Sequence, residues 1–188
     1  MNSYTTQNDL LLSKLLVYYK DKENLEKMLS IINGDSSISL RIVDWFVTNY
    51  AKQKFTQYNI ENKEGVCTRF KVYNDYKLRL KAYSKRRFDP FCRWDRITIP
   101  YGDNSMIQTT IGQLNFFKWA IENDVIAYIT ENYKTIEKDM NDRNSSTKKK
   151  SDKEGCSDNK TRKKREELSV FASRSIKKEN VEIIVSFD

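Results

Sequence analysis

Residues 69–96 combine dense positive charge with aromatic side chains, and this combination constrains the fold more than any other part of the sequence. The stretch holds ten Lys or Arg against three Asp, so it supplies +7 of the formal net charge of +8. Seven aromatic residues are distributed among the charges. Such a mixture suits a surface that neutralises phosphates and stacks on bases.

Within this stretch, residues 73–87 have the spacing of a helix with two different faces. At 100° per residue, one face carries the large side chains Tyr73, Tyr76, Leu80 and Tyr83. A row at i, i+4, i+8 beside it carries Lys77, Lys81 and Lys85. Packing of the tyrosines on the core is favoured over base stacking, and a solvated lysine row is the alternative to a binding surface. The charge continues to residue 96, which favours a polyanionic partner.

The segment after this helix reads as an anchored turn. Pro90 disfavours helical geometry at the residue before it, so the helix ends there. We expect Phe88 and Phe91 to turn inward and Asp89 to serve as a turn or cap residue. Cys92 has basic neighbours, but burial is the commoner state of a lone cysteine, so it is not proposed as a nucleophile.

The composition argues against an enzyme. The absence of histidine removes the commonest general base, the Ser-His and Cys-His nucleophiles and most catalytic zinc sites. The five glycines fit neither the Walker loop nor the dinucleotide fingerprint. Carboxylate catalysis stays open in principle, although the acidic residues are scattered. We therefore predict a non-enzymatic protein with no catalytic residue, no metal and no cofactor.

The apolar spacing predicts an α+β fold, a helix-rich single domain with two short β-hairpins and a C-terminal strand. An antiparallel helix pair is expected before Gly34, with Asn8 or Asp9 as its first cap, and a third helix over about 39–52. The hairpins are expected at 55–60 with 66–72 and at 97–100 with 105–108. Thr110 and Gln113 have capping-box spacing and open a helix that breaks near residue 123 and resumes to about 136.

Four parts of the chain are expected on this basis. They are an N-terminal helix pair at 1–36, a basic and aromatic core at 37–142, a disordered basic linker at 143–165, and a helix and strand docked on the core at 166–188. The linker assignment rests on ten basic and three acidic groups with almost no apolar side chain. The strand assignment rests on the alternation at 181–187.

The linker and the cysteines bear on location. Basic clusters at 148–150 and 162–165 resemble a bipartite nuclear localisation signal, with a solubilising linker as an equal alternative. Three cysteines form no metal-spaced pair, and their odd number favours a reducing compartment. Neither a signal peptide nor a membrane span is expected.

Several segments together resemble a known family. They are SLRIVDWFVTNY at 39–50, YK at 76–77 with FDPFCR at 88–93, TTIGQLNFF at 109–117 and VSFD at 185–188. They are similar to an uncharacterised protein family of nucleocytoplasmic large DNA viruses, of the mimivirus and phycodnavirus kind, over about 38–188. The resemblance carries no established activity. It implies a viral protein made in a eukaryotic host cell, serving transcription, genome packaging or virion structure.

We therefore predict a viral nucleic-acid-binding protein that contacts phosphates, with DNA favoured over RNA. The expected contact residues are Arg69, Lys71, Lys77, Lys81, Lys85, Arg86, Arg87, Arg93 and Arg96. The alternative is a virion structural or assembly protein that binds other viral proteins. The expected location is the cytoplasm or nucleus of the host cell, or the virion.

Overall fold

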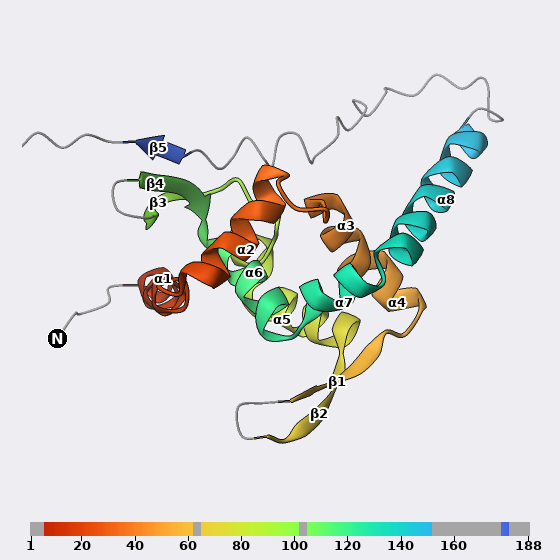
Figure 1. The fold of residues 1–188 in the computed structure, drawn as a ribbon, viewed down its shortest axis with the longest axis horizontal. Helices are drawn as coiled ribbons and strands as arrows, with labels where there is room; N and C mark the ends of the chain where they lie inside the picture. The colour runs from red at the N-terminus through yellow and green to blue at the C-terminus, as the bar shows by residue number, and fades with distance from the viewer. Residues whose placement is uncertain (1–5, 62–64, 102–104, 152–177, 181–188) are drawn as a thin grey trace, which may run out of the picture.

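Helices form most of the part of the chain that the structure describes, and two antiparallel hairpins extend from different parts of the helical body (Figure 1). The computed structural model describes residues 6–61, 65–101, 105–151 and 178–180. The arrangement confirms the prediction of a helix-rich α+β protein with two hairpins.

The N-terminal pair consists of α1 (Gln7–Tyr18) and α2 (Lys22–Asn33). Thr6 caps α1, in place of the predicted Asn8 or Asp9: its hydroxyl accepts a hydrogen bond from the backbone N–H of Asp9 at 3.3 Å. The Asp9 carboxylate accepts one in return from the N–H of Thr6 at 3.0 Å, which completes a capping box. Gly34 ends α2 with a φ of 83°, as predicted.

The two helices are not the antiparallel pair that the sequence suggested. Figure 1 views α1 along its axis while α2 crosses the picture. Both helices contact α6 (Ile111–Glu122), so each buries its apolar side chains against this third helix. The hydroxyl of Tyr19 donates to the backbone carbonyl of Leu114 at 2.8 Å and fixes the turn between the pair on α6.

The third predicted helix is present but is not α-helical throughout. It comprises α3 (Leu40–Trp45), the π-helical segment η1 (Phe46–Tyr50) and α4 (Ala51–Gln53). Ser39 caps it by accepting from the N–H of Ile42 at 3.3 Å. Phe46 and Tyr50, at the two ends of the π-helical segment, are both buried, and their ring centroids lie 5.9 Å apart.

The two hairpins adopt the predicted pairings. The first joins β1 (Gln57–Glu61) to β2 (Cys67–Lys71), and the second joins β3 (Arg96–Tyr101) to β4 (Ser105–Thr110). Tyr58 anchors the first hairpin by donating from its hydroxyl to the carbonyl of Asn123 at 2.7 Å. Ile99 and Ile107 face each other in the second and are both buried.

A third strand, β5 (Lys178–Asn180), pairs antiparallel with β4, so the strand order is β3-β4-β5. A C-terminal strand was predicted at 181–187, and those residues lie outside the described part of the chain. The helix that was predicted ahead of this strand, within 166–188, also lies outside the described residues, and Lys178 begins β5.

The remaining helices are α5 (Val72–Arg87), α6, α7 (Val125–Glu131) and α8 (Tyr133–Ser151). The chain breaks after α6 as predicted, at Asp124, which has a φ of 53°. A second break at Asn132 separates α7 from α8. Because α8 continues to Ser151, residues 143–151 are helical, although the sequence placed them in a linker; residues 152–165 are not described.

The helix α6 forms the centre of the core, and nine of its twelve residues are buried. Its aromatic side chains pack against those of α5 and the following turn. Tyr76, Phe88, Phe116 and Trp119 form one cluster, with ring centroids 5.5 to 6.4 Å apart. Phe88 is 0% exposed, which confirms that it turns inward.

The loop that ends α5 is held on the first turn of α6. The side-chain amides of Gln113 and Asn115 donate to the carbonyls of Pro90 and Arg87 at 3.2 and 2.9 Å. A Cβ on Gly112 would lie 2.8 Å from the Cβ of buried Cys92, so only glycine allows this approach. The predicted cap of α6 is confirmed, since Thr110 accepts from the N–H of Gln113 at 3.2 Å.

We expect Phe88→Ala to lower the free energy of unfolding by about 3–5 kcal/mol, because it empties the middle of the aromatic cluster. Phe55→Ala is the matched control, since Phe55 is 83% exposed. It should change stability by no more than about 0.5 kcal/mol. Urea unfolding of both variants measures the difference, and equal losses would contradict the packing described here.

Candidate nucleic-acid interface

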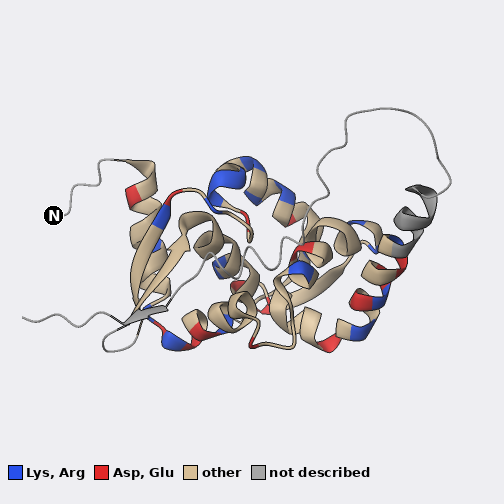
Figure 2. Ribbon diagram, turned by 90° about the horizontal axis from the view of Figure 1, so that it is seen from above, with Lys and Arg blue, Asp and Glu red and all other residues tan. Residues whose placement is uncertain are grey.

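The helix α5 carries the predicted lysine row on its exposed side. Figure 2 shows Lys and Arg residues concentrated on this helix, along the upper edge of that view. Lys77, Lys81 and Lys85 are all exposed, and none of them forms an ion pair within the described part of the chain. The helix is interrupted at Ser84, whose φ is 61°, so Lys85 lies beyond the break. Lys77 and Lys81 lie on one continuous helical face, about 6 Å apart along its axis. The predicted helix is therefore present up to this break, and only Lys77 and Lys81 of the predicted row share its continuous face.

The tyrosine face of α5 packs against the core, the arrangement that the sequence favoured over base stacking. Tyr76 is 7% exposed, and its ring lies 6.0 Å from those of Phe88 and Trp119. Tyr83 stacks on Phe88 at 6.2 Å, and Tyr73 and Leu80 are half-buried against the core. The side chains of Tyr76 and Phe88 are thus not available to stack on bases.

The predicted arginines do not form one continuous surface with the lysines. Arg69 and Lys71 are exposed on β2, in the hairpin that precedes α5. Arg86 binds both carboxylate oxygens of Asp95, at 2.7 and 3.1 Å. Arg96 donates to the side-chain oxygen of Gln108 at 3.2 Å.

Two arginines near the end of α5 differ in exposure. Arg87 is half-buried, and its carbonyl is one of those held by α6. Arg93 is exposed in the loop before β3. Of the nine predicted residues, Lys71, Lys77 and Lys81 are those brought together around one surface.

That surface consists of two adjoining hollows at the beginning of α5. The first has a volume of about 630 Å³ and lies between Lys77 and Lys81. The second has a volume of about 410 Å³ and lies between Lys52, Lys71 and Phe55. Tyr73 and Asn74 line both. Within the described part of the chain, no acidic residue lines either hollow, so no carboxylate within the lining offsets the positive charge of the double hollow.

Two residues of the double hollow, Lys52 and Phe55, were not among the predicted contact residues. The Nζ of Lys52 lies 5.8 Å from the centroid of the Tyr73 ring, over its face. Both residues precede the basic stretch at 69–96. The signal that could have found them is the short sequence KQKF at 52–55, which repeats the mixture of basic and aromatic residues on a smaller scale.

A different hollow, of about 450 Å³, lies at the other end of α5. Trp94, which is 72% exposed, lines it together with Lys85, Arg86 and Asp89. Asp89 accepts from the N–H of Phe91 at 2.8 Å, which confirms its role in the turn. Carboxylates neutralise part of the charge here, because Asp89 lines the hollow and Asp95 pairs with Arg86. This end of α5 is therefore a weaker site for anions.

Two partly buried carboxylates lie near Lys85. Burial and the neighbouring Asp89 raise the pKa of Asp44 to about 6, and Lys85 offsets only part of this rise. Burial likewise raises the pKa of Asp89, against the opposing effects of its hydrogen bond from Phe91 and of Lys85. Acidic groups therefore offset the positive charge of Lys85 more than that of Lys77 or Lys81. Lys77 and Lys81 remain the freest cations on α5.

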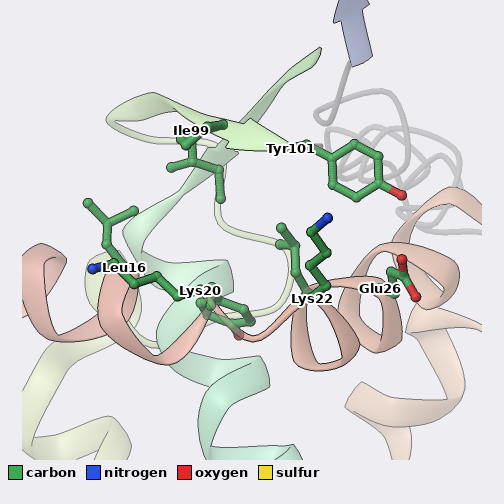
Figure 3. A pocket seen from close by; sticks show the side chains of 9 residues that line it. Leu16, Lys20, Lys22, Glu26, Ile99 and Tyr101 are labelled. Atoms are coloured by element: carbon green, nitrogen blue, oxygen red, sulfur yellow. The ribbon is translucent and has the colours of Figure 1, made fainter. Parts of the chain in front are cut away.

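A third region of the surface is apolar. Between the turn joining α1 to α2 and the strand β3 lies a hollow of about 510 Å³. Figure 3 shows Leu16 and Ile99 directed into it, with Lys22, Glu26 and Tyr101 at its rim. Charges of both signs surround it, which does not favour a polyanion.

The described residues hold no cluster of three or more Cys, Asp or Glu side chains that could bind a metal ion. Over the same residues, every helix is too short or too polar to cross a bilayer.

One sequence-family model covers almost the whole chain. The chain belongs to a family of unknown function (DUF7197), whose model matches residues 2–186. This match includes α1 and α2, which the resemblance noted from the sequence had left out.

One relative links the family to a giant DNA virus, as the sequence indicated. Uncharacterized protein L507 of Acanthamoeba polyphaga mimivirus is 50% identical over 128 residues, which are 65% of this chain and 49% of that protein. The chain thus spans about half the length of this relative. No solved structure matches the chain.

We expect Asp44→Asn to stabilise the protein at pH 7.5 by on the order of 1–3 kcal/mol. A carboxyl whose pKa rises on folding, here from 3.8 to about 6, favours the folded state only at low pH. That contribution is complete below about pH 4 and is lost as the pH rises through 6. The asparagine variant should therefore show its advantage at pH 7.5 and none at pH 4, by urea unfolding.

The exposed Asp35→Asn is the control and should alter stability at neither pH. If Asp44→Asn instead weakens the fold at pH 7.5, the carboxylate is held by a favourable contact and its burial is not the dominant effect.

Proposed function

We propose that the protein is a non-enzymatic nucleic-acid-binding protein that contacts phosphates through α5 and the double hollow beside it. The observation that carries the proposal is the exposed lysine row, free of ion pairs within the described residues, on a helix whose other face is fixed in the core. Lys77 and Lys81 lie about 6 Å apart along the helix axis and can meet two phosphates of one strand, which advance about 3.4 Å each along a duplex.

The remaining predicted basic residues would contribute to phosphate binding to different extents. Lys71 lies close enough to act with the row, whereas Arg86 and Arg96 already have side-chain partners and can contribute less. Arg69, Arg87 and Arg93 would add charge from neighbouring elements. A giant-virus protein of this kind would meet nucleic acid in the host cell or in the virion. DNA is favoured over RNA as the nucleic acid that it binds.

The first test is the salt dependence of binding to a labelled duplex. Phosphate contacts release counterions, so log K should fall linearly with log salt. If about six phosphates are contacted, the slope should be near −5. Fluorescence anisotropy over a salt series measures it. The absence of binding at low salt, or a slope near zero, would reject the proposal.

The second test reverses charge on the row. Lys77→Glu combined with Lys81→Glu should greatly weaken binding, and should reduce the salt slope of any residual binding by about 2, because two phosphate contacts are removed. The fold should persist, since both side chains are exposed and leave the core intact.

The matched control is Lys134→Glu combined with Lys138→Glu on α8. It changes the net charge equally and has the same i, i+4 spacing on an exposed helix face. Its binding should stay close to that of the parent. If the two double variants behave alike, net charge alone governs binding and α5 is not the contact surface.

A second candidate function, assembly with other viral proteins, is favoured by the apolar hollow in Figure 3. Its mixed rim of lysines and Glu26 suits a protein surface better than a phosphate backbone. This function moves ahead if the α5 double variant binds nucleic acid as well as the parent does.

A further inference from the structure

The most exposed aromatic ring of the described residues, Phe55, lies beside the basic helix. It is 83% exposed, and its backbone has a φ of 48°, in the left-handed region. A bulky residue is rarely found there, because its Cβ crowds the following carbonyl. Exposure and backbone strain both disfavour a phenylalanine at this position. Strain of this kind concentrates at binding sites.

The surrounding backbone holds Phe55 in place. The N–H of Thr56 donates to the carbonyl of Ala51 at 3.1 Å, and the N–H of Val72 donates to the carbonyl of Thr56 at 3.3 Å. The turn between α4 and β1 is thereby tied to the first residue of α5. The ring is presented from a fixed support, so little conformational entropy is lost when a ligand stacks on it.

The hollow beside Phe55 offers polar groups as well as charge. Gln57 and Asn74 line it, and each amide has donors and an acceptor. The hydroxyl of Thr56, which lines the same hollow, is buried and has no hydrogen-bond partner within the described residues. Lys52 and Lys71 supply positive charge on the same lining.

This hollow continues into the one between Lys77 and Lys81, because Tyr73 and Asn74 line both. A chain of phosphates can therefore run from the Phe55 hollow onto the lysine row without meeting a lining carboxylate. Trp94 is similarly exposed, but its hollow contains Asp89 and adjoins the Arg86–Asp95 ion pair. The charge pattern thus distinguishes Phe55 from Trp94.

We propose that the double hollow binds single-stranded nucleic acid, with an unpaired base stacked on Phe55 and the adjoining phosphates on Lys71, Lys77 and Lys81. A duplex keeps the faces of its bases stacked within the helix, so only an unpaired base can cover the Phe55 ring. The inference rests on the proposed function and adds the form of the nucleic acid to it. Stacking of one base is worth about 5- to 150-fold in affinity.

The experiment measures binding of the full chain to a labelled oligothymidylate and to a labelled duplex, for the parent and three variants. Phe55→Ala should weaken oligothymidylate binding by about 5- to 150-fold and leave duplex binding unchanged. Phe55→Trp should retain single-strand affinity, since indole also stacks on bases. Trp94→Ala removes a ring of similar exposure in the other hollow and should leave both affinities unchanged.

The outcomes separate the two proposals. If neither probe binds at low salt, the proposed function itself fails. If both probes bind and Phe55→Ala changes neither affinity, nucleic-acid binding stands and the stacking site is wrong. If Phe55→Ala weakens both probes equally, or Trp94→Ala reproduces its effect, the ring does not recognise unpaired bases, and a partner of another class, such as a protein, becomes the better occupant of the hollow.

Discussion

The packing of α6 against its neighbours is the interaction on which the rest of the structure depends. This helix is buried on most of its circumference and contacts α1, α2, α5 and α7. Trp119 joins two roles within it: its ring packs in the aromatic cluster, and its Nε1 donates to the carboxylate of Asp75 on α5 at 2.6 Å. Because one face of α5 is fixed in this way, its lysines can only face solvent.

The same packing decides which aromatic residues can meet a ligand. The basic stretch has seven aromatic residues, and those on the core side of α5 and in its terminal turn are covered by α6. Phe55 and Trp94 stay outside because each lies in a connection between elements, where the chain reverses away from the core. The candidate aromatic contacts therefore come from the connections, whereas Lys77 and Lys81 lie on a helix that the core holds in place.

Several features were readable from the sequence because they depend on near neighbours in the chain. The two hairpins, the cap at Thr110, the end of α2 at Gly34 and the two faces of α5 all follow from spacing and local turn chemistry. The cap of α1 was misplaced by two or three residues, since Thr6 and Asp9 act together and only their geometry reveals it. Helix α8 continued into a polar segment that composition alone assigned to a linker.

The sequence by itself determined the helical content, the charge of residues 69–96 and the relation to a giant-virus family. It could not determine which charges stay free, because the pairing of Arg86 with Asp95 and the proximity of Asp44 to Asp89 depend on how the chain closes on itself. Nor could the sequence show that residues 52–55 lie beside the beginning of α5. Tertiary structure decided both, since long-range contacts are selected by the packing of whole elements around α6 and no local pattern encodes them.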